Sequence, residues 1–155
     1  MPRTVAIGIQ DFEKIIINNY FYIDKTHFIK EWWESGDDVT LITRPRRFGK
    51  TLTMSMLESF FSVNYKDRKE LFEHLKIWND MKYQEIQGTY PVLNITFSGV
   101  KETTFSNARI KFYNIIINLY NQHRYLLEEQ DAASQTVLRK NATLLFIQTV
   151  MKLHW

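Results

Sequence analysis

Apolar positions along this chain recur with two distinct spacings. In several stretches they return every three to four residues, which is the period of a helix with a buried face. Residues 51–61 are the clearest case: Leu52 and Met56 mark one apolar side, and Leu57 and Phe61 mark an adjacent one. This helix is therefore expected to be buried on more than one side. The predicted helices span residues 11–17, 27–34, 51–61, 67–75, 104–129 and 141–154.

Short runs of β-branched and aromatic residues predict strands between some of these helices. Residues 39–43 (VTLIT) follow a turn signal and precede Pro45. Residues 91–97 (PVLNITF) begin with a proline, and at the first position of a strand the missing N–H of proline removes no hydrogen bond between strands. A shorter strand is predicted at residues 20–23. Strands that alternate with long helices predict an α/β fold with a parallel sheet, although two or three strands are few for such a sheet.

Composition narrows the classes of function. With 155 residues the chain suffices for one domain, and the absence of cysteine excludes disulfide frameworks and cysteine-based zinc sites. The four histidines are far apart and show no metal-ligand spacing. A net charge of +3 is too mild to indicate nucleic-acid binding by itself.

Because no stretch reaches the length of an apolar membrane span and no secretory segment is visible, we expect a cytoplasmic protein with no membrane association.

The strongest chemical signal lies between the predicted strand at residues 39–43 and the predicted helix at residues 51–61. The intervening loop, residues 44–51 (RPRRFGKT), ends in Gly-Lys-Thr. A phosphate-binding loop of the pattern G-x-x-x-x-G-K-[ST] joins a strand to a helix in this way, with backbone N–H groups and the helix N-terminus around the phosphates. Arg44 departs from the pattern, because it stands where the first glycine is usual.

Each residue type of the loop fits a role in holding a nucleoside triphosphate. Gly49 lets the backbone approach the phosphates, Lys50 would contact the β- and γ-phosphates, and Thr51 would ligate Mg²⁺. Arg46 and Arg47 are either solvated cations or groups that offset phosphate charge. Phe48 is either a packing anchor or a ligand contact. The predicted nucleotide-binding residues are Arg44, Pro45, Arg46, Arg47, Phe48, Gly49, Lys50, Thr51 and Leu52, with ATP and Mg²⁺ as ligands.

Several segments together resemble a bacterial AAA-ATPase-like family. These are residues 7–12 (IGIQDF), 20–26 (YFYIDKT), 43–51 (TRPRRFGKT), 75–78 (LKIW) and 90–97 (YPVLNITF). The resemblance is close over residues 5–97 and looser beyond them. It implies a P-loop NTPase fold, ATP as the ligand, an arginine as the normal residue at position 44, and often a nuclease-like domain further along the chain.

The resemblance also implies an acidic strand that orders Mg²⁺, of the Walker B type, after a helix similar to residues 143–154. The sequence ends at Trp155, where that strand would begin. We therefore expect residues 1–155 to form the N-terminal portion of an AAA-ATPase-like domain, with an incomplete P-loop NTPase-like parallel sheet flanked by helices. Negligible ATP turnover is expected, as is exposed apolar surface that favours self-association.

Two other functions stay open at the level of the sequence. The cations of the loop could bind nucleic-acid backbones, or the chain could be an inactive fragment of a larger ATPase or nuclease protein. Within residues 20–26, Tyr22, Asp24 and Lys25 are expected to pack and cap the first helices, with direct contact to a ligand as the alternative.

Overall fold

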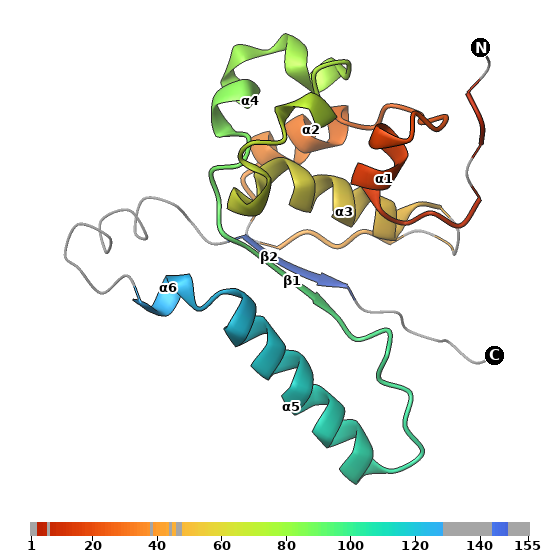
Figure 1. Ribbon diagram of the computed structural model, residues 1–155, viewed down its shortest axis with the longest axis vertical. Helices are drawn as coiled ribbons and strands as arrows, with labels where there is room; N and C mark the ends of the chain where they lie inside the picture. The colour runs from red at the N-terminus through yellow and green to blue at the C-terminus, as the bar shows by residue number, and fades with distance from the viewer. Residues whose placement is uncertain are drawn as a thin grey trace. The chain divides into compact units, whose positions relative to one another are not determined.

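Two compact units make up the chain, Met1–Tyr90 and Pro91–Trp155. They are seen in a computed structural model that describes residues 3–5, 7–37, 39–43, 45, 48–128 and 144–148 (Figure 1). The proposed phosphate loop belongs to the first unit, and both strands belong to the second.

The first unit is built from helices and short 3₁₀ turns. Its helix α1 contacts α3, and α2 contacts the third 3₁₀ turn. The Asp11 carboxylate caps α1 by accepting a hydrogen bond from the Lys14 N–H at 3.2 Å. The elements are α1 (Phe12–Ile17), α2 (His27–Ser35), α3 (Lys50–Phe61), η1 (Val63–Tyr65), η2 (Lys69–Leu71), η3 (Lys76–Asn79) and α4 (Met81–Ile86).

Aromatic side chains fill the core of this unit around α3. Phe60 is fully buried and meets Phe72 edge-on, with ring centroids 5.1 Å apart, while Phe12 stacks on Phe72 at 5.2 Å. On the adjacent side of α3, Phe61 stacks on Trp33 of α2 at 5.2 Å. Burial of each such ring stabilises the fold by about 2–3 kcal/mol. The prediction that α3 is buried on two sides is therefore confirmed.

A tight backbone crossing joins the end of α3 to the segment that follows α4. The Gly88 N–H donates to the Phe60 carbonyl at 2.8 Å, and the Tyr90 N–H donates to the Phe61 carbonyl at 2.9 Å. Gly88 has φ +67°, and a Cβ at this position would lie 2.4 Å from the Cα of Lys66. Both the positive φ and the close approach require glycine here.

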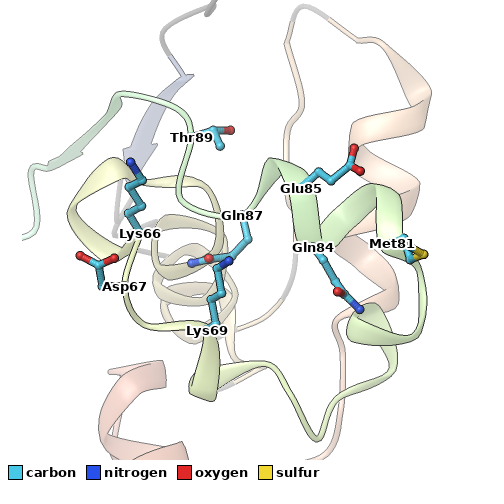
Figure 2. Close-up of a pocket in the computed structure, with 8 residues that line it drawn as sticks. All are labelled: Lys66, Asp67, Lys69, Met81, Gln84, Glu85, Gln87 and Thr89. Carbon is cyan, nitrogen blue, oxygen red and sulfur yellow. The ribbon is translucent and has the colours of Figure 1, made fainter.

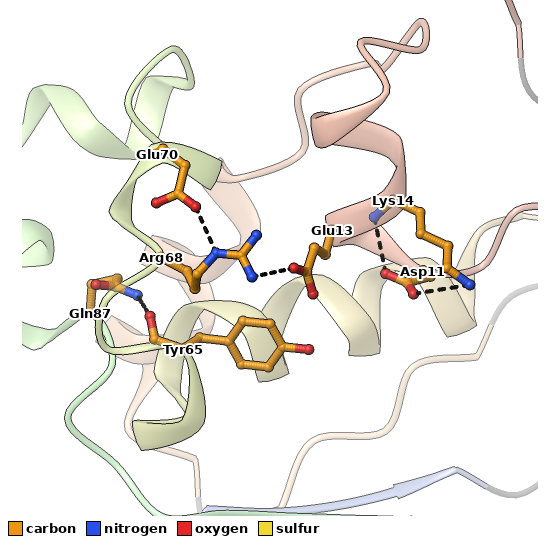
Figure 3. A network of polar contacts seen from close by, with 7 residues as sticks. All are labelled: Asp11, Glu13, Lys14, Tyr65, Arg68, Glu70 and Gln87. Carbon is orange, nitrogen blue, oxygen red and sulfur yellow. Dashed lines mark hydrogen bonds and ion pairs between the residues drawn. The ribbon is translucent and has the colours of Figure 1, made fainter.

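Polar contacts on the surface tie α1 to the turns after α3 (Figure 3). Arg68 forms ion pairs with Glu13 of α1 and, at 2.6 Å, with Glu70. Nearby, the Gln87 side-chain amide donates to the Tyr65 carbonyl at 2.8 Å. Because these ion pairs are partly exposed, they contribute little to the free energy of unfolding. Their main effect is to fix how α1 lies against the turns after α3.

The second unit contains a pair of parallel strands and the longest helix. The pairing runs from Val92 opposite Leu144 to Thr96 opposite Gln148. Thr104 caps the long helix by accepting a hydrogen bond from the Asn107 N–H at 3.3 Å. Among the described helices, none combines the length and the apolar content that a transmembrane span requires. The elements are β1 (Val92–Thr96), α5 (Phe105–Gln122), α6 (Tyr125–Glu128) and β2 (Leu144–Gln148).

Two predicted strands are absent from the structure. Residues 39–43 and 20–23 are not paired with any described strand. Val39 and Leu41 are 85% and 82% exposed, and the segment is held instead by a hydrogen bond from the Trp32 indole to the Thr40 hydroxyl at 3.0 Å. High β-propensity means that the side chains of a segment fit a sheet. Without a neighbouring strand to pair with, such a segment does not form a strand.

Three predicted helices need correction. Residues 144–148 of the helix predicted at 141–154 form β2, because a short apolar run fits either state and the partner strand β1 decides between them. The rest of that range lies outside the described residues. The helix predicted at 104–129 breaks at His123, and within 67–75 only the turn η2 is helical. The parallel sheet of a P-loop NTPase, which the sequence predicted for this chain, stays a prediction.

Candidate functional site

The proposed phosphate loop meets α3 at a glycine with left-handed backbone geometry. Gly49 has φ 75° and ψ 21° and is the N-cap of α3, whose first residue is Lys50. The Gly49 carbonyl accepts hydrogen bonds from the Thr53 N–H at 2.8 Å and the Thr53 hydroxyl at 3.0 Å, which fix the first turn. The prediction that the helix opens at Lys50-Thr51 is therefore confirmed, whereas the strand predicted before the loop, at residues 39–43, is not formed. The N–H groups of this turn and the positive end of the helix dipole face the loop.

The remaining loop residues are accessible where the structure describes them. Pro45 is exposed, and Lys50, Thr51 and Leu52 are half-buried. Phe48 is 60% exposed, so it is not a packing anchor, and its role as a ligand contact stays a prediction. Three predicted binding residues lie outside the described residues: Arg44, Arg46 and Arg47.

The first half of α3 is held by the segments that precede it in the sequence. The Phe12 N–H donates to the Ser55 hydroxyl at 3.0 Å, and the Tyr22 hydroxyl donates to the Met56 sulfur at 3.2 Å. Burial raises the pKa of Tyr22 to about 12, so this hydroxyl stays protonated at neutral pH. These contacts place parts of the first two family-like segments against the helix that begins at Lys50.

Asp24 and Thr26 form a polar clamp with the segment before η3. One Asp24 oxygen accepts from the Thr26 N–H at 2.8 Å and the Thr26 hydroxyl at 2.6 Å, and the other accepts from the Lys76 N–H at 2.8 Å. The fully buried Thr26 hydroxyl accepts from the Ile77 N–H at 3.2 Å. Burial alone would raise the pKa of Asp24, but the hydrogen bonds from Thr26 and Lys76 outweigh it and lower that pKa. The clamp thus joins the YFYIDKT and LKIW segments.

Lys25 lies next to the phosphate loop, whereas packing and capping of the first helices was the role expected first for this residue. Its ammonium nitrogen is 3.6 Å from the position that a Cβ on Gly49 would occupy. The expected packing role is confirmed for Tyr22, which contacts Phe12 and Met56. Asp24, in contrast, does not cap α2 directly but bonds to its N-cap residue Thr26 and to Lys76. The alternation of side chains in an extended segment could have indicated the placement of Lys25. The side chains of Asp24 and Thr26 share one side of such a segment, which leaves Lys25 on the other side.

A pocket lies elsewhere in the first unit, between the turns after α3 and α4 (Figure 2). It has a volume of about 370 Å³, and no residue of the phosphate loop lines it. Its walls mix Lys66 and Lys69 with Asp67 and Glu85, so the charges of opposite sign offset one another. This pocket is open and shares no residue with the predicted nucleotide site.

Metal-binding side chains do not gather in the part of the chain that the structure describes. No group of three histidine, cysteine, aspartate or glutamate residues is placed to hold an ion there. His27 and His74 are exposed, His123 is buried at the end of α5, and His154 lies outside the described residues.

A Gly-Lys-Thr step at the N-terminus of a 12-residue helix is one part of the phosphate-loop pattern, whose other part, a strand before the loop, is not formed by residues 39–43. The family model described as a predicted AAA-ATPase matches residues 6–153. The chain belongs to this family of ATPase-like proteins, as its sequence segments predicted.

One relative that the chain matches is a longer protein. An uncharacterized protein in the vnfD 5′ region of Azotobacter chroococcum mcd 1 is 37% identical over 98 residues. The match covers 63% of this chain and 17% of that protein, so the chain spans about a sixth of the length of the relative. No solved structure matches the chain.

Proposed function

We propose that this chain binds ATP with Mg²⁺ through residues 44–52. The observation that carries the proposal is the position of Lys50, which begins α3 directly after the left-handed Gly49. In this arrangement the Lys50 ammonium contacts the β- and γ-phosphates, and the Thr51 hydroxyl is a ligand of the metal that the nucleotide brings. Membership of an ATPase-like family supports the same ligand.

The accessible loop is consistent with a ligand that enters from solvent. Pro45 and Phe48 are exposed, and the backbone at Gly49 carries no Cβ that would separate it from a phosphate oxygen. Helix α3 is anchored in the aromatic core at its far end by Phe60 and Phe61. A rigid helix with a fixed first turn presents its N–H groups to an anion without further ordering, which lowers the entropic cost of binding.

Binding, rather than hydrolysis, is the activity that the described residues support. Hydrolysis needs a carboxylate at the end of a neighbouring strand to order Mg²⁺ and to activate water. Of the two described strands, β1 is followed by Phe97 and Ser98, and β2 ends at Gln148. Neither of these positions supplies a carboxylate.

Isothermal titration of the purified chain with Mg²⁺–ATP tests the proposal. Lys50→Ala should weaken binding by about tenfold or more, because it removes a charge-assisted contact to phosphate. Lys82→Ala is the matched control: this lysine pairs with Glu34 at 3.7 Å and should leave the affinity unchanged. Equal effects of both variants, or no binding by the unmodified chain, would refute the proposal. Oligonucleotide binding that falls steeply with salt and ignores ATP would favour a nucleic-acid function instead.

A further inference from the structure

The side chain of Lys25 ends in an electrostatically unfavourable place when no anion is present. Its ammonium lies beside Gly49, 3.6 Å from the position of a Cβ on that residue. The same point is the N-terminus of α3, which carries the positive end of the helix dipole, and the next residue is Lys50. A cation at a helix N-terminus is destabilising, so this placement calls for an explanation.

Ordinary structural partners do not provide that explanation. Within the described residues, no carboxylate lies within ion-pair distance of the Lys25 ammonium. The adjacent Asp24 carboxylate is occupied by the N–H and hydroxyl of Thr26 and by the Lys76 N–H. Those bonds direct the carboxylate toward η3, whereas the ammonium of Lys25 lies at the loop.

The clamp formed by Asp24 and Thr26 fixes the backbone on both sides of Lys25. Asp24 is bonded to Lys76 and Thr26 to Ile77, with Thr26 fully buried. On its C-terminal side the Lys25 carbonyl accepts from the Phe28 N–H at 3.0 Å, in the first turn of α2. The backbone of this residue is therefore ordered before any ligand binds, and only its side chain needs to adjust.

We propose that Lys25 is a second phosphate-binding cation of the nucleotide site, which contacts the polyphosphate of ATP together with Lys50. The inference rests on the proposed function. A lysine ammonium offers three N–H donors and a compact charge, and it suits a group of oxygens that is shared with other cations. On binding, the negative phosphates convert the repulsion between the Lys25 ammonium and the positive end of α3 into attraction. Within residues 24–26 (DKT), Asp24 and Thr26 thus position the segment, and Lys25 binds the polyphosphate.

Titration of four proteins with ATP, ADP, AMP and tripolyphosphate tests this role. Lys25→Met should weaken ATP and tripolyphosphate binding by about tenfold or more, and AMP binding much less, because the contact is to the polyphosphate. Lys25→Arg keeps the charge and should restore part of the affinity. The control, Lys30→Met, removes an exposed lysine of α2 that pairs with Asp80 at 3.7 Å, and should bind as the unmodified chain does.

The thermal stability of the ligand-free proteins separates binding from packing. If Lys25 binds phosphate, Lys25→Met removes only repulsion, and the melting temperature should stay the same or rise. A fall in melting temperature together with unchanged ATP affinity would overturn the inference and restore a packing role. Retained ATP affinity in Lys25→Met with loss in Lys50→Ala would overturn the inference but leave the proposed function intact. Failure of the unmodified chain to bind any of the four ligands would refute both.

Discussion

Helices α3 and α5 both carry many apolar side chains, yet they bury them very differently. Met56, Leu57, Phe60 and Phe61 of α3 are all buried. The longer α5, with 18 residues, contributes no buried residue in the part of the chain that the structure describes, and its Phe105 is 82% exposed. The local supports of α5 are the Thr104 cap, an ion pair between Lys111 and Glu102, and the stacking of Phe97 on Phe112 at 4.8 Å.

This contrast separates two sources of helix stability. Helix α3 is stabilised mainly by tertiary packing in the core, whereas the contacts of α5 among the described residues, with β1 and Phe97 and through its cap, bury little of its surface. Apolar patterning alone therefore does not determine burial, because a partner surface is also needed. The proposed nucleotide site lies at the start of the well-packed helix, where a fixed geometry is most useful.

The largest expected effect comes from truncating one aromatic ring in each helix. Phe60→Ala should lower the free energy of unfolding by about 3–5 kcal/mol, because it leaves a cavity among fully buried rings. The exposed Phe105→Ala should change it by less than about 0.5 kcal/mol. Equilibrium urea denaturation followed by circular dichroism measures both. Similar losses in the two variants would show that α5 is as well covered as α3, and the contrast would disappear.

A smaller effect is expected from alkaline pH, acting on the first unit. Burial, followed by the hydrogen bond to Glu34 at 2.9 Å, raises the pKa of Tyr83 from 10.0 to about 12. The unfolded chain therefore loses this proton first, so the stability is complete below pH 10.0 and is lost as the pH rises toward 12. A difference of two pKa units amounts to about 3 kcal/mol at most.

Urea denaturation at a series of pH values, with tyrosinate absorbance as the titration signal, measures this loss. Tyr83→Phe keeps the ring in the core and removes the ionisable group, so its stability should depend less on pH above 10.0. Tyr22, whose pKa burial also raises to about 12, should leave a remaining alkaline loss in that variant. An unchanged alkaline slope in Tyr83→Phe would contradict the assignment.

The smallest effect should be the same in both units, because helix capping is local. Asp11→Ala in α1 and Thr104→Ala in α5 each remove a side-chain acceptor for a backbone N–H, which should cost about 1 kcal/mol. Hydrogen exchange of the amides in the first turn of each helix measures the loss. Asp11→Asn and Thr104→Ser retain an acceptor and should restore most of the protection. A much larger loss at Thr104 would show that α5 depends on its cap for its existence.

The sequence predicted best those elements whose ends carry their own signals. Helix α3 begins where Gly49-Lys50 predicts it, and α2 begins at His27 as its periodicity indicates. The β1 strand and the Thr104 start of the long helix were also predicted. For the three helices, the chemistry of the cap or the period of the apolar residues is contained within a few residues, so no distant partner has to be known. The strand β1 differs from them, because it pairs with β2 about fifty positions further along the chain.

Elements that depend on distant partners were predicted wrongly. The apolar run at Leu144–Gln148 was assigned to a helix, but a parallel register with Val92–Thr96 makes it a strand. Residues 39–43 have strand composition and no strand partner among the described residues. At the candidate site, the position of Lys50 followed from a local motif. The approach of Lys25 did not, because it depends on hydrogen bonds from residues about fifty positions further along the chain.

The backbone crossing at Gly88 constrains how this sequence can drift during evolution. Any side chain at this position would collide with the main chain of Lys66, which cannot be relieved by a change of rotamer. Gly99, where nothing lies within 4 Å of the corresponding position, carries no such restriction. Among natural relatives that keep the crossing, we therefore expect glycine at position 88.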